Sequence, residues 1–163
     1  MSKTILITGA TSGFGEAMAH VFAAAGNKLI ITGRKESLLS GLQETLVAKH
    51  NASVHTLCFD VQNKEAVFAA INSIPADFKN IDVLINNAGL ALGRDAFQDA
   101  NLDDWETMID TNVKGLLYVS KAVLPLLINN KKAHIINIGS TAGVEVYKEG
   151  NVYCASKHAV AAI

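Results

Sequence analysis

Tyr153 and Lys157 are two residues whose types and spacing can support acid–base chemistry. Side chains four residues apart on a helix lie on the same face, so a helix here places the phenol beside the ammonium group. A free tyrosine, with a pKa of about 10, is a weak acid–base catalyst near neutral pH. A nearby positive charge favours the phenolate, so the pair could act as general acid and base. The same spacing also occurs by chance on helix surfaces, where such a pair has no catalytic role.

A glycine-rich loop between an apolar strand and a helix forms a second candidate site. Three glycines stand in the spacing Gly-x-x-x-Gly-x-Gly. Glycine permits a tight turn and lets the backbone approach a pyrophosphate, while N–H groups at the start of the next helix bind phosphate. The loop therefore predicts a dinucleotide-phosphate site, with an ordinary tight turn as the alternative. The residues assigned to this site are Gly9, Thr11, Ser12, Gly13, Phe14 and Gly15.

Arg34 and Lys35 follow the second predicted strand, where many dinucleotide-binding domains carry an acidic residue. A carboxylate at this place binds the ribose hydroxyls of NAD, whereas an arginine suits the 2′-phosphate of NADP. Two cations can pair with a dianionic phosphate, and the arginine fork can do so with two parallel hydrogen bonds. The sequence therefore favours NADP(H) over NAD(H), with a solvated charge pair at a helix start as the alternative.

The elements that must position these residues alternate between strands and helices along the whole chain. Short β-branched runs without polar alternation are typical of parallel strands buried on both faces. The predicted strands cover residues 4–8, 28–32, 53–59, 81–85 and 135–138. The predicted helices cover about 15–25, 37–50 and 64–74, a long stretch from 101 or 103 to about 130, and a final stretch from 151 or 152 onward. This pattern predicts a single α/β domain over residues 1–163, with a doubly wound parallel sheet of the Rossmann type.

The last predicted helix still shows its helical pattern at Ile163 and has no Gly, Asn or Pro to end it. Such a chain would leave its fifth strand as an apolar sheet edge. We therefore expect the domain to be incomplete at its C-terminus, with further strands missing.

Composition excludes several classes of function. The chain has 163 residues, with 14 Lys and Arg against 15 Asp and Glu, and a formal net charge of −1. Half of the residues are hydrophobic and 18% are charged, which predicts a sizeable core and no nucleic-acid-binding surface. The apolar runs are too short for a membrane span. Cys58 and Cys154 do not form a disulfide framework, and the histidines show no metal-binding spacing, so we expect a cytoplasmic protein without a metal site.

Several motifs in order resemble the short-chain dehydrogenase/reductase family across the whole chain. They are Thr8-Gly9-x-x-x-Gly13-x-Gly15, Asp60-Val61, Asn86-Asn87-Ala88-Gly89, Asn112, Ser140 and Tyr153-x-x-x-Lys157. Segments 86–93, 104–112 and 134–143 are similar to the NADP-dependent 3-hydroxy acid dehydrogenases, which include serine and malonic semialdehyde reductases.

The resemblance implies a catalytic role for four residues. Tyr153 would be the general acid in reduction and the base in oxidation, and Lys157 would favour its phenolate and hold the nicotinamide ribose. Ser140, 13 residues before Tyr153, would hydrogen-bond the substrate oxygen, although it could simply cap a turn. Asn112 would hold a water in a proton relay to Lys157 at an irregularity in the long helix, although it could be an ordinary polar helix residue.

The resemblance also implies cofactor contacts along the chain. Asp60 and Val61 would contact the adenine, although Asp60 could instead cap the next helix. The segment after the fourth predicted strand would line the ribose side of the cofactor and brace the sheet. The residues assigned there are Asn87, Ala88 and Gly89, and Tyr153 and Lys157 are assigned to cofactor binding as well as to catalysis.

The function implied is an NADP-dependent oxidoreductase that interconverts a carbonyl and an alcohol by hydride transfer. The expected substrates are small 3-hydroxy acids or serine-like compounds, bound by Ser140 and Tyr153. One alternative is a reductase of 3-oxoacyl thioesters, and another is a truncated, non-catalytic NADP(H)-binding module. We expect a small-molecule substrate, no nucleic-acid or membrane partner, and a homo-oligomer, either a dimer or a tetramer.

Overall fold

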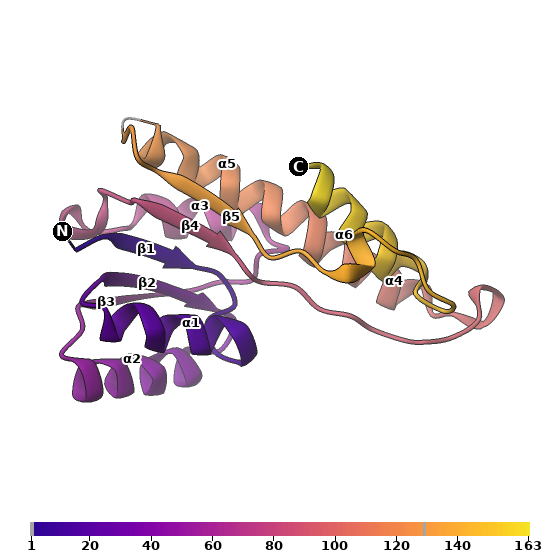
Figure 1. Ribbon diagram of the computed structural model, residues 1–163, viewed down its shortest axis with the longest axis horizontal. Coiled ribbons are helices and arrows are strands. Elements are labelled where there is room, and N and C mark those ends of the chain that lie inside the picture. Colours follow the sequence, from indigo (N-terminus) through magenta and orange to yellow (C-terminus); the bar gives the residue numbers. More distant parts are fainter. Residues whose placement is uncertain (1, 129) are drawn as a thin grey trace.

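A computed structural model describes residues 2–128 and 130–163. Its centre is a five-stranded parallel sheet with the order β3-β2-β1-β4-β5 (Figure 1). Because the chain crosses from β3 to the opposite side of β1 to begin β4, the sheet is doubly wound. The predicted Rossmann-type α/β fold is confirmed. The strands are β1 (Thr4–Ile7), β2 (Lys28–Gly33), β3 (Val54–Cys58), β4 (Val83–Asn86) and β5 (His134–Asn137).

Helices connect the strands, and most lie where the sequence pattern predicted them. Helix α1 begins two residues before the predicted start, and α3 ends two residues before the predicted end. The helices are α1 (Gly13–Ala24), α2 (Glu36–His50), α3 (Lys64–Asn72), α4 (Leu102–Ile109), α5 (Leu116–Leu127) and α6 (Asn151–Ala162).

The predicted long helix contains the irregularity that the resemblance implies at Asn112. A π-helical segment over Asp110–Gly115 separates α4 from α5, so the stretch is not one uniform α-helix. Asn101 is the N-cap, since its side chain accepts a hydrogen bond from the Asp103 N–H at 2.9 Å. A π turn adds one residue to the hydrogen-bonded ring and changes which side chains face the sheet. This register change matters for the site because the segment contains Asn112.

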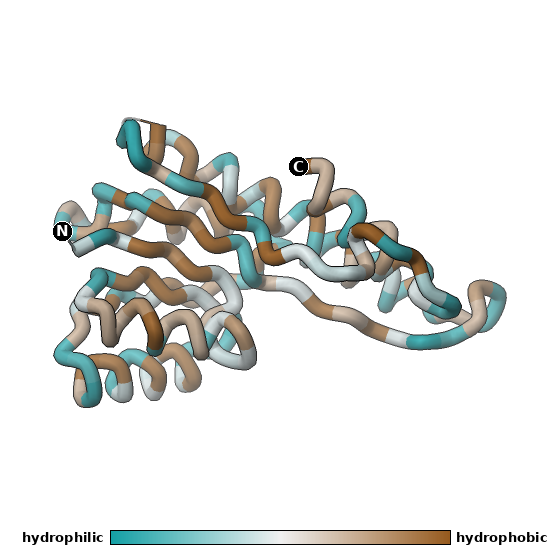
Figure 2. The backbone as a smooth tube through the Cα atoms, viewed as in Figure 1, coloured by the Kyte–Doolittle hydropathy of each residue, from teal (hydrophilic) through white to brown (hydrophobic). Residues whose placement is uncertain are grey.

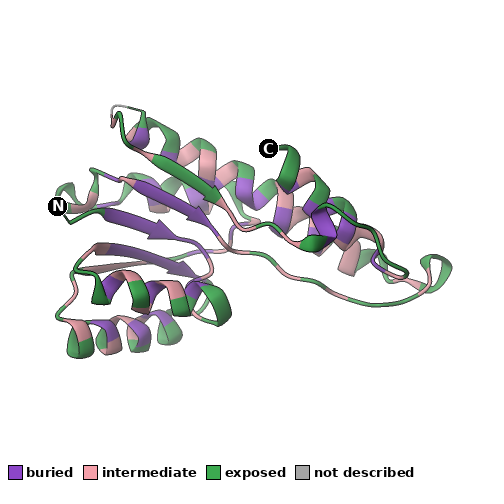
Figure 3. Cartoon of the chain, viewed as in Figure 1, coloured by how far each residue is buried: buried purple, intermediate pink, exposed green. Residues whose placement is uncertain are grey.

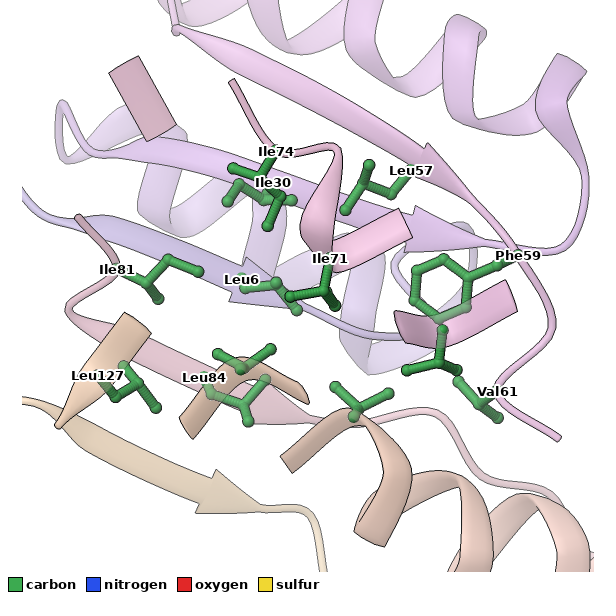
Figure 4. Close-up of a cluster of buried hydrophobic side chains, with 13 residues drawn as sticks. Leu6, Ile30, Leu57, Phe59, Val61, Ile71, Ile74, Ile81, Leu84 and Leu127 are labelled. Carbon is green, nitrogen blue, oxygen red and sulfur yellow. The ribbon is translucent and has the colours of Figure 1, made fainter. Parts of the chain in front are cut away.

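Two apolar clusters cover the two faces of the sheet. Helices α1 and α2 pack on one face against Ile5 and Ile7 of β1, and α3 and α5 pack on the other face against Leu6. Alternate residues of a strand point to opposite faces, so β1 is buried on both sides. Figure 2 shows brown, apolar segments in the inner strands β2, β1 and β4. The cluster on the face covered by α3 and α5, which includes Leu6, Ile71 and Leu127, is called the α3–α5 cluster and is drawn in Figure 4.

The fifth strand is more exposed than the others. The inner strands β1 and β4 are buried along their length, whereas Ile135 and Ile136 of β5 are 44% and 42% exposed (Figure 3). Among the described strands, β5 pairs with β4 alone, so the predicted apolar sheet edge is confirmed. Within the described part of the chain, none of the helices has the length and apolar character needed to cross a bilayer.

Candidate active site

The carboxyl ends of the parallel strands meet at one edge of the sheet, and a cleft of about 540 Å³ lies there. The loops after all five strands contribute to it. Most of the residues assigned to the site from the sequence line this cleft. They are Gly9, Thr11, Ser12, Gly13, Phe14, Arg34, Asp60, Val61, Asn87, Ala88, Gly89, Ser140, Tyr153 and Lys157. Gly15, Lys35 and Asn112 lie outside the lining.

The glycine loop has the geometry that a phosphate site needs. Gly9 and Gly13 have φ angles of +63° and +54°, a region that glycine adopts without strain. At Gly15, a Cβ atom would collide with the Gly9 carbonyl oxygen and lie 2.6 Å from the Asn87 amide nitrogen. Gly15 is therefore a packing residue beneath the loop and not a direct contact, which explains its absence from the lining.

The N-terminus of α1 borders the cleft and lacks a side-chain cap. The first N–H groups of any α-helix lack a partner within the helix. Among the described residues, the Ser12 side chain at the N-cap makes no capping hydrogen bond, so it does not occupy these donors. Because the helix dipole adds partial positive charge at this end, the loop fits a dinucleotide pyrophosphate.

Arg34 and Lys35, the residues predicted to bind a 2′-phosphate, follow the end of β2. Arg34 lines the cleft, and its Nη1 lies 3.7 Å from Oδ2 of Asp60. Lys35 is exposed at the N-cap of α2 and lies outside the lining, so the two adjacent cations are not placed alike. The alternative that Asp60 caps the next helix is wrong, because Asn63 caps α3 by accepting the Ala66 N–H at 2.9 Å.

Thr8 holds the glycine loop against the loop after β4. Its hydroxyl oxygen accepts hydrogen bonds from the N–H groups of Asn87 and Ala88 at 3.0 and 2.9 Å. The Asn87 amide in turn donates to the carbonyl oxygens of Thr8 and Gly9 at 2.9 and 3.0 Å. The sequence motif includes Thr8 but assigns it no role. A threonine that directly follows an apolar run was the only signal for it in the sequence.

Three side chains with acid–base or hydrogen-bonding ability line the part of the cleft formed by α6 and the loop after β5. Tyr153 and Lys157 lie on α6, and Ser140 precedes a short 3₁₀ turn after β5. The Ser140 oxygen accepts the Ala142 N–H at 3.1 Å, so it caps this turn. A hydroxyl that accepts one bond can still donate its own proton, so capping and binding a substrate oxygen are compatible here.

Lys157 is the most buried charged group at this end. Its Nζ donates to the Ile138 carbonyl at 3.0 Å, and the residue is 8% exposed. Burial lowers the pKa of the Lys157 ammonium, because removal from water disfavours the charged form. Lys157 is therefore a better proton donor than an exposed lysine.

Asn112 braces the catalytic end from the π segment. Its amide oxygen accepts the Leu90 N–H at 2.9 Å, and its amide nitrogen donates to the Leu90 carbonyl at 2.8 Å. The second amide proton goes to the hydroxyl of Ser156 at 3.0 Å. With both protons used, a water held by Asn112 has to donate to one of its oxygen atoms. The predicted proton relay remains a prediction.

Ser156 connects Asn112 to the catalytic helix. It is fully buried, and its hydroxyl donates to the Tyr153 carbonyl at 2.8 Å. Ser156 was not predicted from the sequence, because a serine beside Lys157 on a helix has no distinguishing pattern. Within the described residues, no three His, Cys, Asp or Glu side chains gather as a metal site requires.

Comparison with known proteins assigns the chain to a family. Residues 3–163 match the short chain dehydrogenase family. The chain belongs to this family. The predicted resemblance is thereby confirmed on nearly the whole sequence.

Curated relatives and a solved structure narrow the likeness. The NADP-dependent 3-hydroxy acid dehydrogenase YdfG of Salmonella typhi is 50% identical over 153 residues, which are 94% of this chain and 60% of that protein. Sulfoacetaldehyde reductase 2 of Chromohalobacter salexigens is 51% identical over 158 residues, which are 96% of this chain and 62% of that protein. The closed form of serine dehydrogenase complexed with NADP+ has 48% identity and a TM-score of 0.87, over 95% of this chain and 61% of that one.

These short chain dehydrogenases are longer than the chain described here, which spans about 60% of the length of the curated relatives it matches. Residues 3–163, which match the family, contain the glycine loop, Arg34 and the group formed by Ser140, Tyr153 and Lys157. The cleft also has lining residues that the sequence analysis did not select. They are Thr32, Gly33, Phe59, Leu90, Ala91, Thr111, Ile138 and Gly139. Most of these are apolar or lie in loops, so their types gave no indication of a site.

Proposed function

We propose that residues 1–163 form one NADP(H)-binding catalytic domain of an oxidoreductase that interconverts a carbonyl and an alcohol. The observation that carries this proposal is the single cleft that joins a phosphate-binding helix end and Arg34 to Ser140, Tyr153 and Lys157. Relatives named for NADP dependence and a solved NADP+ complex support the choice of cofactor. When bound, the nicotinamide supplies or accepts a hydride at the substrate carbon.

The residues of the chain would divide the work of binding along the cleft. The glycine loop and the start of α1 would hold the pyrophosphate, and Arg34 would pair with the 2′-phosphate. Lys35 would add positive charge from outside the cleft. Asp60, Val61 and the stretch from Asn87 to Gly89 would border the adenosine and ribose portions.

The residues at the catalytic end would move the proton and stabilise charge. Ser140 would donate its hydroxyl proton to the substrate oxygen, which becomes more negative as reduction proceeds. Tyr153 would give that oxygen a proton in reduction and take it back in oxidation. Lys157 would hold a positive charge beside the phenol and bind the nicotinamide ribose. Asn112 would fix the loop after β4 and hold a relay water.

The substrate class we propose is small 3-hydroxy acids and serine-like compounds, together with their carbonyl forms. The relatives reported above are named for 3-hydroxy acids, sulfoacetaldehyde and serine, and all of these carry an anionic group near the reacting carbon. These relatives do not favour the alternative of 3-oxoacyl thioesters. We further propose a cytoplasmic homo-oligomer, either a dimer or a tetramer.

Replacement of Tyr153 by Phe tests the assignment. Loss of the phenolic proton donor should reduce turnover by at least about 100-fold, while NADPH affinity stays unchanged. The measurement is the decrease of NADPH absorbance with a 3-oxo acid, with NADPH fluorescence for binding. Tyr118→Phe on α5 is the matched control, because Tyr118 packs against the α3–α5 cluster, outside the cleft lining.

Two results would contradict the proposed function. Full turnover by the Tyr153→Phe variant would remove Tyr153 from the mechanism. NADPH binding by the unaltered protein without turnover of any 3-hydroxy acid, 3-oxo acid or aldehyde would instead favour the non-catalytic binding module.

A further inference from the structure

The ion pair between Arg34 and Asp60 lies within the cleft, where the proposed function places the 2′-phosphate. The Nη1 to Oδ2 distance is 3.7 Å, and the side chains are 63% and 38% exposed. Both residues line the cleft. An anion that binds to Arg34 therefore meets the Asp60 carboxylate nearby.

Asp60 is the fixed member of this pair. Its other oxygen, Oδ1, accepts the Gln62 N–H at 3.0 Å. The residues on either side, Phe59 and Val61, are each 7% exposed and point into the α3–α5 cluster (Figure 4). Arg34 has the more exposed and longer side chain, so it is the member that can turn toward a ligand.

A 2′-phosphate changes the electrostatic balance of this pair. The phosphate carries close to two negative charges, and Arg34 cannot be fully shared between it and the carboxylate. Because Arg34 Nη1 lies 3.7 Å from Asp60 Oδ2, a phosphate held by Arg34 would also come near the fixed charge of Asp60, and salt screens repulsion between such close charges only in part. Both effects oppose binding of a phosphorylated ribose, and neither acts on a ribose without the phosphate.

We propose that Asp60 is a specificity-determining residue that weakens binding of 2′-phosphorylated adenosine ligands by competing for Arg34. This inference rests on the proposed function, which assigns Arg34 to the 2′-phosphate. It reaches beyond that function because it gives Asp60 an unfavourable role toward the phosphorylated cofactor. The opposite role, in which Asp60 holds Arg34 in the binding position, predicts an effect of the opposite sign.

The experiment measures binding of 2′,5′-ADP and 5′-AMP by calorimetry to the unaltered protein and to Asp60→Asn. Asparagine has the same shape and can still accept the Gln62 N–H, so the turn is retained. An exposed ion pair contributes up to about 1 kcal/mol, so Asp60→Asn should raise the affinity for 2′,5′-ADP relative to that for 5′-AMP about two- to fivefold. Loss of a contact between Asp60 and the adenine would act on both ligands alike and cancels in this ratio. This increase in affinity should become smaller as the salt concentration is raised, because salt screens the charges.

Two further variants complete the design. Asp99→Asn removes a charge at an exposed position outside the cleft lining and should change neither affinity. Arg34→Met should weaken 2′,5′-ADP selectively. When Asp60→Asn is combined with Arg34→Met, it should raise the relative affinity for 2′,5′-ADP by less than it does alone, because only direct repulsion by Asp60 is then removed.

The outcomes separate the inference from the function on which it rests. An unchanged or lowered ratio of the affinities for 2′,5′-ADP and 5′-AMP in Asp60→Asn overturns the competitive role of Asp60 while NADP(H) binding stands. If the unaltered protein binds 2′,5′-ADP no better than 5′-AMP, the assignment of Arg34 fails, and the proposed NADP(H) preference fails with it.

Discussion

The two halves of the cleft consist of different kinds of chemical group. From β1 to α3, the site consists mainly of backbone: two glycines with positive φ, a third pressed against a carbonyl, and the free end of α1. From β4 to α6, it consists of side chains held by side-chain hydrogen bonds. The first half therefore requires positions without a side chain, and the second half requires particular polar side chains.

The two halves also differ in how their strands are protected. Both β1 and β2 are enclosed between helices, whereas β5 has exposed isoleucines. A phosphate site made of backbone needs a rigid support, because backbone groups cannot turn to compensate for a shift. Side chains such as Ser140 can adjust by rotation, so the catalytic half can function beside a less enclosed strand.

The largest expected effect comes from adding one carbon in the first half. Gly15→Ala should lower the free energy of unfolding by about 3 kcal/mol or more, because the new Cβ meets backbone atoms that cannot move aside. Urea unfolding followed by circular dichroism measures this. Gly41→Ala is the matched control, since a Cβ at this position in α2 meets nothing within 4 Å among the described residues. It should stabilise the chain by up to about 1 kcal/mol. Equal stability of the two variants would contradict the steric account of the glycine loop.

A moderate effect is expected from removing one hydroxyl in the second half. Ser156→Ala leaves a buried Asn112 N–H without its acceptor, so the free energy of unfolding should fall by about 1–3 kcal/mol. Ser73→Ala removes an exposed hydroxyl that bonds the Ala70 carbonyl, and should change stability by at most about 0.5 kcal/mol. If Ser156→Ala is no worse than its control, the connection from Asn112 to the catalytic helix is not structural support.

The smallest expected effect concerns a polar group in the apolar first half. Within the described residues, Nε2 of His55 on β3 is buried without a hydrogen-bond partner, and burial lowers the pKa of this imidazole. The unfolded chain therefore takes up the proton first as the pH falls below about 6.5, and stability decreases from there until the folded state is also protonated. His55→Val should flatten this pH dependence, as measured by urea unfolding from about pH 7.5 to about pH 5.

Thr56→Val, the neighbouring change on the same strand, should leave the pH dependence of the free energy of unfolding as it is in the unaltered protein. If His55→Val also leaves this pH dependence unchanged, the imidazole does not contribute to it. The first half would then owe its acid sensitivity to other groups.

The amino-acid sequence by itself determined the fold class, the family and the residue types of the site. Apolar runs and helical periodicity reflect burial, which is set by the whole pattern of a segment and survives errors of a few residues at its ends. Glycines that no other residue can replace, and a tyrosine and lysine one turn apart, carry their chemistry in their types and spacing. These features could be predicted because each depends on residues close together along the chain.

Only the tertiary structure decided how residues far apart in sequence are paired. The contact of Arg34 with Asp60, the bracing of Leu90 by Asn112, and the place of Ser156 between Asn112 and Tyr153 join segments from different strands and helices. The π turn at Asp110–Gly115 sets the register that directs Asn112 to Leu90. Hydrogen bonds and ion pairs act over a few ångströms in space, and separation along the sequence does not record that distance.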